Sequence, residues 1–231
     1  MIHPNTTDIK HYFIDALANE EFTTDRTGQK TIEMIGASFM ADKPTIFGTP
    51  NDEYIEIEKA WYESQSTNVN WMSDTYNRNV PAAWKAAANT YGEINSNYGH
   101  IIYSDKYHHQ FGRVLDELLT NIDGRRATMI YTRPSIWEEY NEDGKNDFIC
   151  TNAVTYYIRD GKIHCVVQMR SNDVVFGYKN DYAWQLHVLE QLTREYNSCY
   201  LANAADADYR REMEVGDIIW LSLIHISEPT R

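Results

Sequence analysis

Cysteine is scarce in this chain of 231 residues, which contains only three, at positions 150, 165 and 199. A small, odd number of cysteines without close pairing argues against a disulfide framework and favours a reducing cytoplasm. No apolar run reaches the roughly 18 residues that a membrane-spanning helix needs. The N-terminus lacks the basic and then apolar layout of a signal peptide. Secreted disulfide scaffolds and membrane proteins are therefore poor candidates.

Positive charge is also scarce, because 21 Lys and Arg residues face 34 Asp and Glu residues, a formal net charge of −13. This balance disfavours a polymeric nucleic-acid partner, since such binders carry a basic face. A single nucleotide needs only a few well-placed arginines and stays possible. No Walker or dinucleotide-binding glycine loop occurs, and no Cys or His spacing matches a zinc site.

The composition is that of a globular protein, 42% hydrophobic and 24% charged, and long enough for one substantial core. Apolar residues recur at helical spacing in four stretches, which predict helices over residues 8–18, 51–63, 104–119 and 181–196. Thr7 or Asp8 is the expected cap of the first helix. No repeat, low-complexity tract or linker divides the chain.

Strands are predicted over residues 31–39, 127–132, 151–159, 162–169 and 215–223, with a polar turn over residues 24–30. Asp160-Gly161 separates the third and fourth of these strands and is a strong hairpin signal. Hairpin strands mixed with long helices favour an α+β or mixed-sheet domain over a doubly wound fold.

A thiol, an arginine and two carboxylates occur within one short stretch of the sequence, as Cys150, Arg170, Asp173 and Asp181. A thiolate is the reactive form of cysteine, and its formation from a pKa of about 8.5 requires nearby positive charge. An antiparallel hairpin brings Arg170, at the end of its second strand, close to Cys150 at the start of its first. This segment predicts a nucleophile, an anion-binding group and acceptors that read a ligand.

A free cysteine is more often a packed core residue than a nucleophile, and we expect the core role for Cys165 and Cys199. Glu58 lies on a half-apolar helix, where it is either a surface charge or a buried acid for proton transfer. The pair Arg125-Arg126 precedes a strand and is either a solvated turn or a phosphate-binding pair.

Adjacent histidines at positions 108 and 109 fall within a predicted helix. Neighbouring helical residues point to different faces, so a shared metal ion is not expected.

Several segments agree in order and approximate spacing with one known family. They are Asp25-Arg26-Thr27-Gly28, Glu58-Lys59-Ala60-Trp61, Trp84, Gly92 through Gly99, Arg125-Arg126, Cys150, and Arg170 through Asp181. From about residue 8 to residue 220 the chain resembles the thymidylate synthase family, and most closely its phage-encoded deoxycytidylate hydroxymethylase branch. The resemblance implies an α+β fold in which a large twisted mixed sheet packs with helices and one sheet face forms a homodimer interface.

The resemblance also implies how a nucleotide binds. Cys150 is the nucleophile that adds to C6 of a pyrimidine, which makes C5 a carbon nucleophile toward methylenetetrahydrofolate. The 5′-phosphate is expected to bind a set of side chains to which the partner subunit contributes two arginines. This set comprises Arg26, Arg170 and Ser171 from one subunit, and Arg125 and Arg126 from the other.

The remaining implied roles concern the folate and the protons. Glu58 and Tyr98 are expected to organise water and proton transfers. Trp84 and Asp173 are expected to contact the folate co-substrate. No metal is expected.

The chain departs from ordinary thymidylate synthases at two positions. Thr151 replaces the histidine that follows the nucleophile, as the hydroxymethylase branch also tends to have, and Asp181 replaces the base-reading asparagine. A carboxylate accepts from the 4-amino group of cytosine and favours a proton on N3, but offers no donor to O4 of uracil. An unmatched buried polar contact costs roughly 1–3 kcal/mol. Asp181 therefore favours dCMP over dUMP as substrate.

The activity implied by the resemblance is conversion of dCMP, methylenetetrahydrofolate and water into 5-hydroxymethyl-dCMP and tetrahydrofolate, in the cytoplasm of the host cell of a phage. The alternatives are a thymidylate synthase, a dCMP methylase, and an inactive dimer that only binds nucleotide. A cysteine hydrolase is a distant further option, because no histidine lies near Cys150 in the sequence.

The C-terminal stretch does not match the family. Residues 221–231 read Leu-Ser-Leu-Ile-His-Ile-Ser-Glu-Pro-Thr-Arg, which looks like the translation of a sequencing-library adaptor. We therefore expect a single family domain over residues 1–220 and a non-native tail in place of the family C-terminus. The alternative is a divergent natural tail. His225 falls close to the expected position of a sugar-binding histidine, but we assign it no such role.

Overall fold

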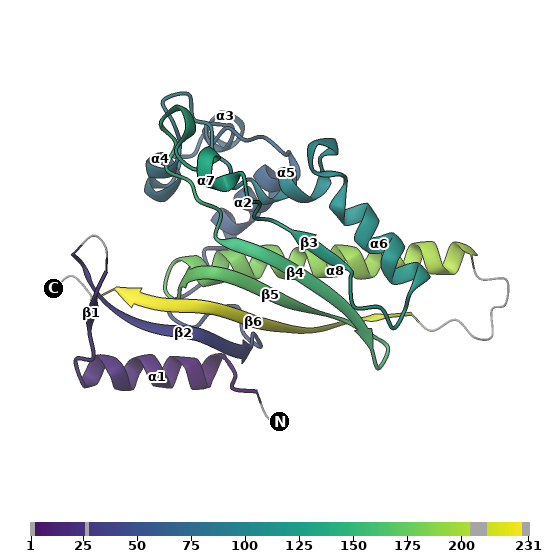
Figure 1. Cartoon of the computed structure of the whole chain (residues 1–231), viewed down its shortest axis with the longest axis horizontal. Coiled ribbons are helices and arrows are strands. Elements are labelled where there is room, and N and C mark those ends of the chain that lie inside the picture. The colour runs from purple at the N-terminus through teal and green to yellow at the C-terminus, as the bar shows by residue number, and fades with distance from the viewer. Residues whose placement is uncertain (1–2, 26–27, 204–211, 228–231) are drawn as a thin grey trace.

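A long mixed sheet forms the centre of the computed structural model, which describes residues 3–25, 28–203 and 212–227 (Figure 1). Its strands are β1 (Thr23–Thr24), β2 (Lys30–Met40), β3 (Thr128–Ile130), β4 (Thr151–Arg159), β5 (Lys162–Asp173) and β6 (Glu214–Ser227). Across the described residues their order is β1-β2-β6-β5-β4-β3. Among the strands that the structure describes, only β5 and β6 pair in parallel, which confirms the predicted mixed-sheet class.

The hairpin between β4 and β5 is built as the sequence predicts. Asp160 and Gly161 have φ angles of 52° and 76°, the left-handed conformations that a two-residue turn of this kind requires. The turn sets the pairing of Arg159 with Lys162, and the ladder then runs to Thr151 opposite Met169. The open end of the hairpin therefore carries the candidate nucleophile and its arginine side by side.

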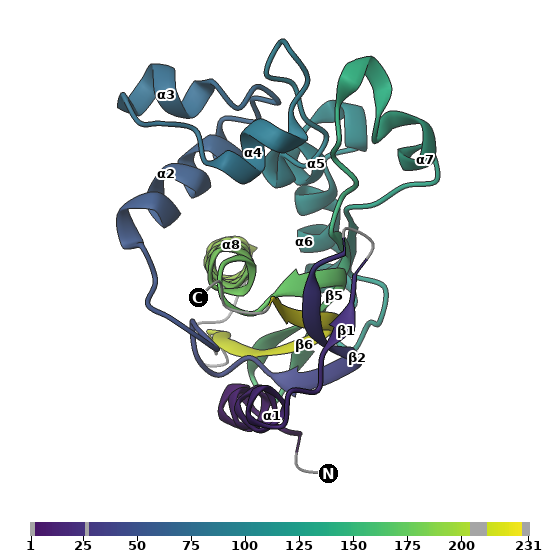
Figure 2. The same cartoon turned by 90° about the vertical axis from the view of Figure 1, so that its left-hand side faces the viewer.

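Helices pack around this sheet, and most of them lie on the side of α8 (Figure 2). They are α1 (Thr6–Ala18), α2 (Asp52–Glu63), α3 (Trp71–Tyr76), α4 (Ala82–Ala87), α5 (Tyr98–Tyr103), α6 (Gln110–Thr120), α7 (Ile136–Glu139) and α8 (Gly177–Asn203). The long helix α8 packs on β5 and β6, α6 and α2 pack on α8, and α1 lies along β2. Among the helices in the described part of the chain, none is long and apolar enough to cross a membrane.

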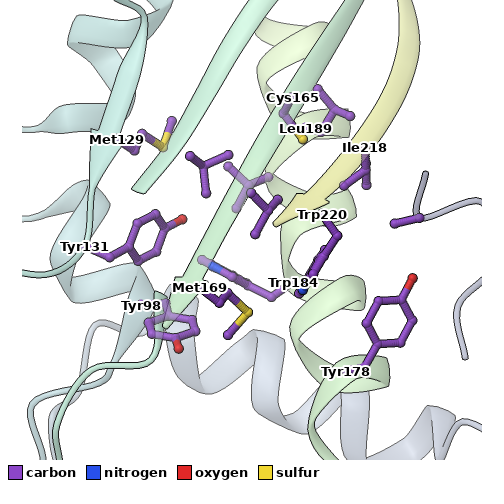
Figure 3. Close-up of a cluster of buried hydrophobic side chains, with 14 of the residues drawn as sticks. Tyr98, Met129, Tyr131, Cys165, Met169, Tyr178, Trp184, Leu189, Ile218 and Trp220 are labelled. Carbon is purple, nitrogen blue, oxygen red and sulfur yellow. The ribbon is translucent and has the colours of Figure 1, made fainter. Parts of the chain in front are cut away.

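The core lies between α8 and the sheet, where large aromatic side chains interlock (Figure 3). Trp184 and Leu189 of α8 and Trp220 of β6 are essentially fully buried. Cys165 is also fully buried in β5, which confirms its predicted core role. Burying each such large apolar side chain contributes roughly 1.5–3 kcal/mol, so this layer fixes α8 on the sheet.

The predicted cap of the first helix and the predicted start of the helix over residues 104–119 are wrong for identifiable reasons. The cap of α1 is Asn5, whose side chain accepts from the backbone N–H groups of Thr7 and Asp8, so neither of those residues is the cap. The predicted helix over residues 104–119 begins only at Gln110, because His108 and His109 both have left-handed backbone conformations. The two histidines therefore lie in a turn and not on a helix.

The short helices α3, α4, α5 and α7 were not anticipated, since none exceeds six residues and such lengths give no periodic signal. The strand predicted over residues 215–223 continues to Ser227. Residues 221–227 of the expected tail thus lie within β6, between β2 and β5. Ile224 and Ile226 are buried there, because their alternation matches the two-residue period of a strand.

Candidate functional site

Cys150 immediately precedes β4, and the side chain of Arg170, near the end of β5, contacts it. The Arg170 guanidinium donates from Nη2 to the Cys150 Sγ at 3.4 Å and to the Phe148 carbonyl at 2.7 Å. Its Nε donates to the Ile149 carbonyl at 3.1 Å, and its carbon Cζ lies 5.2 Å from the centre of the Phe148 ring. The predicted approach of Arg170 to the thiol is confirmed.

The charge of Arg170 does not by itself activate the thiol. Burial raises the pKa of Cys150 to about 11, the Arg170 charge opposes this rise, and the Asp181 and Asp147 carboxylates add to it. At neutral pH the sulfur of the free protein is thus almost entirely a thiol, which is a poor nucleophile. Thiolate formation therefore requires an additional change when a substrate binds.

Asp181, in the second turn of α8, lies near enough for its charge to raise the pKa of this thiol. Its Oδ2 accepts a hydrogen bond of 2.6 Å from Nδ2 of Asn172, which is almost fully buried on β5. Gly177 leaves room for the pair, because an added Cβ would lie 3.4 Å from Asn172 Nδ2. Burial, together with the charge of the nearby Glu58, raises the pKa of Asp181 to about 8, while the Asn172 donor opposes the rise.

Glu58 is a buried acid and not a surface charge, with 6% of its area exposed. Its Oε1 accepts from the Tyr54 hydroxyl at 2.5 Å and from the Trp84 indole Nε1 at 3.0 Å. Burial raises the pKa of Glu58, while both hydrogen bonds oppose that rise. A buried carboxyl with a raised pKa is suited to proton transfer near neutral pH.

Tyr98 begins α5 and is almost fully buried between two other rings. It stacks on Tyr62 with ring centres 5.3 Å apart and meets Tyr131 edge-on at 5.2 Å. Gly99 permits this approach, because a Cβ there would lie 1.8 Å from the Tyr62 carbonyl oxygen. Burial raises the pKa of Tyr98, and the charges of Asp181 and Cys150 raise it further, which places these groups in one neighbourhood.

The segment after Arg170 carries two more of the predicted residues. The Ser171 hydroxyl lies 3.4 Å from His225 Nδ1. Asp173 Oδ1 accepts from the backbone N–H of Val175 and Phe176, and its Oδ2 lies 4.0 Å from His225 Nε2. Asp173 therefore anchors the turn into α8, and His225 of the expected tail lies beside the site.

Two predicted phosphate ligands lie away from Cys150 in this chain, and the position of a third is not described. Arg26 lies outside the described residues. Arg125 and Arg126 are exposed just before β3, and Arg126 Nε donates to Glu117 at 2.8 Å. The backbone N–H of Tyr156 in β4 donates a hydrogen bond to the carbonyl of Ala127, the residue after Arg126. Because Tyr156 lies six residues beyond Cys150, the two arginines lie roughly 20 Å from the thiol along the strand.

Two residues of the cluster were missed by the sequence reasoning. Tyr54 lies four positions before Glu58 on the same helix, and this spacing could have indicated the contact. Asn172 follows an irregularity in the pairing of β5 with β6 between Met169 and Asn172, so a strict two-residue alternation could not have placed its side chain. No group of three or more potential metal ligands occurs among the residues that the structure describes.

A sequence model of the thymidylate synthase family matches residues 10–203 of this chain. Proteins of Enterobacteria phages T4 and T2 named deoxycytidylate 5-hydroxymethyltransferase are 50% identical to it over 205 residues. The match covers 89% of this chain and 78% of each of those proteins.

More distant relatives carry the same family name. A thymidylate synthase of Vesicomyosocius okutanii is 23% identical over 212 residues, which cover 86% of this chain and 70% of that protein. The crystal structure of thymidylate synthase from T4 phage matches with a TM-score of 0.72 and 18% identity, over 96% of this chain and 82% of that one. This structural match supports the fold.

Proposed function

Because this chain belongs to the thymidylate synthase family, we propose that it is a deoxycytidylate 5-hydroxymethyltransferase. It would convert dCMP, methylenetetrahydrofolate and water into 5-hydroxymethyl-dCMP and tetrahydrofolate. The observation that carries the proposal is the cluster of Cys150, Arg170 and Asp181, in which a thiol, an exposed guanidinium and a buried carboxyl meet. The 50% identity to phage enzymes of that name supports the choice of reaction.

Cys150 is proposed to attack C6 of the pyrimidine. Its raised pKa implies that the proton leaves only as the nucleotide binds and the base approaches the sulfur. Arg170 uses Nε and Nη2 for bonds to the protein, while Nη1 makes no hydrogen bond within the described residues. This exposed edge is available to a phosphate oxygen, with the Ser171 hydroxyl next in the chain.

Asp181 is proposed to read the base. Because Asn172 occupies Oδ2 from one side, the carboxyl is held in one orientation with acceptor positions left for the 4-amino group. Its pKa of about 8 permits the carboxyl to carry a proton at neutral pH and to share it with N3 of cytosine. Uracil already carries a hydrogen on N3, which places a second donor opposite the protonated carboxyl, and its O4 finds no donor when the carboxyl is ionised.

Glu58 and Tyr98 are proposed to orient water molecules and to transfer protons during the reaction. When bound, methylenetetrahydrofolate would supply the one-carbon unit to C5. The half-exposed ring of Trp84 fits a role in holding the folate, because its N–H is engaged by Glu58 while part of its surface stays open. Asp173 fits less directly, since one of its oxygens already holds the turn.

The last step decides between two products. After C5 has lost its proton and tetrahydrofolate has left, the exocyclic methylene carbon accepts the oxygen of a water molecule. A C–O bond forms, the water proton passes to Glu58, and the electron pair shifts through the ring to expel the Cys150 sulfur. The ring double bond is thereby restored. Thr151 follows the nucleophile, at the position where the family resemblance implies a histidine for a thymidylate synthase.

The working unit is proposed to be a homodimer in which Arg125 and Arg126 enter the partner's phosphate site. Their exposure, and their separation from Cys150 in one chain, support that arrangement. The half-exposed face of β4, β5 and β6 opposite α8 would then form the interface. We place the reaction in the cytoplasm of a phage-infected cell. We also propose that residues 221–231 are non-native, with residues 1–220 as the family domain.

Turnover in water enriched in heavy oxygen tests this proposal. Purified protein is incubated with dCMP and methylenetetrahydrofolate, and the nucleotide product is identified by mass. Incorporation of heavy oxygen into 5-hydroxymethyl-dCMP is the expected result. A methylated nucleotide would instead identify a methylase, and binding of dCMP without turnover would identify an inactive nucleotide-binding dimer.

A further inference from the structure

Tyr54 and Trp84 hold one oxygen of the Glu58 carboxylate. The Tyr54 hydroxyl donates to Glu58 Oε1 at 2.5 Å, and the Trp84 Nε1 lies 3.0 Å both from that oxygen and from the Tyr54 hydroxyl. The three polar groups therefore form a triangle. Within the described residues Glu58 Oε2 accepts no hydrogen bond, so the two carboxylate oxygens differ in their hydrogen bonding: Oε1 accepts two and Oε2 accepts none.

Local structure positions both donors before any ligand binds. Asn51 caps α2 and accepts a hydrogen bond of 3.1 Å from the Tyr54 backbone, which fixes the turn that carries the tyrosine. Glu58 follows one helical turn later, on the same face. Trp84 meets the fully buried ring of Trp61 edge-on at 5.0 Å, so its indole cannot turn freely away from Glu58.

We propose that Tyr54 is a positioning residue for Glu58: it fixes Oε1 and leaves Oε2 as the oxygen that receives the water proton. This inference rests on the proposed function, because it assigns a role within the hydration step. Tyr54 acts through Glu58 and need not touch the nucleotide. The assignment explains why a buried acid with two donors on one oxygen keeps the other oxygen unpaired.

The charges around Glu58 fit this role. The titratable groups that face it are Tyr54 and Tyr62 from its own helix and Asp181 from α8, while α4 contributes only the neutral indole of Trp84. Burial raises the pKa of Tyr54, and the Glu58 charge raises it further, so the hydroxyl remains a donor. The Tyr54 bond stabilises the ionised form of Glu58 against burial.

A purely structural hydrogen bond is the competing explanation, and the chain offers a matched control for it. The Tyr103 hydroxyl donates to Gln191 Oε1 at 2.5 Å, the same length, but to a neutral acceptor. Tyr103→Phe and Tyr54→Phe each remove one hydroxyl from a partly buried bond. Only the second change alters the partner of a catalytic acid.

The decisive measurement is the titration of Glu58 in the ligand-free protein, followed by its protonated carboxyl stretch in infrared spectra and assigned with Glu58→Gln. Tyr54→Phe should raise the Glu58 pKa by about one to two units, since a hydrogen bond to an ionised group is removed. Tyr103→Phe should leave this titration unchanged. An unchanged Glu58 titration in Tyr54→Phe would overturn the inference.

Turnover supplies the second readout. Tyr54→Phe should lower kcat for 5-hydroxymethyl-dCMP about tenfold to a hundredfold, with little change in KM for dCMP, and shift the acid limb of the kcat profile to higher pH. Lower thermal stability with an unchanged pH profile would show a structural bond and refute the role. Inactivity of the unmodified protein, combined with the expected infrared shift, would contradict the proposed function and leave the Tyr54–Glu58 contact supported.

Discussion

Replacing Asp181 with asparagine should exchange the preferred base. Asn172 Nδ2 lies 2.6 Å from Asp181 Oδ2 and can donate only to an acceptor. The new amide would therefore turn its carbonyl oxygen toward Asn172 and its NH2 group toward the base. That NH2 matches O4 of uracil and opposes the 4-amino group of cytosine.

The magnitude follows from two buried hydrogen bonds, one to cytosine that the substitution removes and one to uracil that it creates. Each is worth roughly 1–3 kcal/mol, so kcat/KM for dCMP should fall, and that for dUMP rise, by about tenfold to a hundredfold. The ratio of the two constants should therefore change by about a hundredfold to ten-thousandfold. The assay is initial-rate kinetics with each nucleotide at saturating methylenetetrahydrofolate, with products separated by mass.

Asp173→Asn provides the control for this experiment. It makes the same isosteric change eight positions earlier, at a carboxyl that anchors the turn before α8. It should affect dCMP and dUMP turnover alike and leave their ratio unchanged. An unchanged ratio in Asp181→Asn, or an equal change in both variants, would refute the base-reading role of Asp181.

The remaining predictions concern reactivity, stability, assembly and the C-terminus. Alkylation of Cys150 by iodoacetamide should be slow at neutral pH and accelerate toward pH 11, and Arg170→Ala should slow it because the arginine lowers the thiol pKa; equal rates in both proteins would contradict that effect. Because the pKa of Asp181 rises from 3.8 to about 8 in the folded state, the native state retains a proton that the unfolded chain has released, so the contribution of Asp181 to stability is greatest below pH 4 and is lost as pH rises to about 8. Asp181→Asn should remove this dependence, at most about 1.4 kcal/mol per pH unit, in denaturant titrations across that range; parallel stability curves would argue against it. Inactive Arg126→Ala and Cys150→Ser proteins should regain activity when refolded together, because a mixed dimer holds one intact site, and no recovery would argue against arginines that cross the interface. Replacing residues 221–231 with a family-like C-terminus should raise kcat, and an unchanged kcat would count against a non-native tail.

Much of the sheet could be predicted because its signals are local. Asp160-Gly161 fixed the hairpin, and the hairpin alone implied that Arg170 approaches Cys150. The helix on which Asp181 lies was visible from its apolar spacing. The left-handed turn at His108 and His109 was not, because both residues fit a helix by periodicity and only tertiary packing favours the turn.

The pKa values of the site residues were harder to predict than which residues form the site. The sequence suggested that Arg170 would activate Cys150, yet burial outweighs that charge and keeps the thiol pKa high. Glu58 is also buried in the protein interior. The half-apolar pattern of its helix did not distinguish a buried position from a surface position. Desolvation depends on every element packed around a group, so it cannot be deduced from spacing along one segment.

Trapping of the covalent adduct tests the central claim most directly. With 5-fluoro-dCMP and methylenetetrahydrofolate, the fluorine at C5 blocks loss of a proton, so the nucleotide should remain bonded to the enzyme. Peptide mass spectrometry should then locate the modification on Cys150, and Asp181→Asn should shift trapping to 5-fluoro-dUMP. An adduct on another residue, or a preference of the unmodified protein for 5-fluoro-dUMP, would contradict a cytosine-specific attack by Cys150.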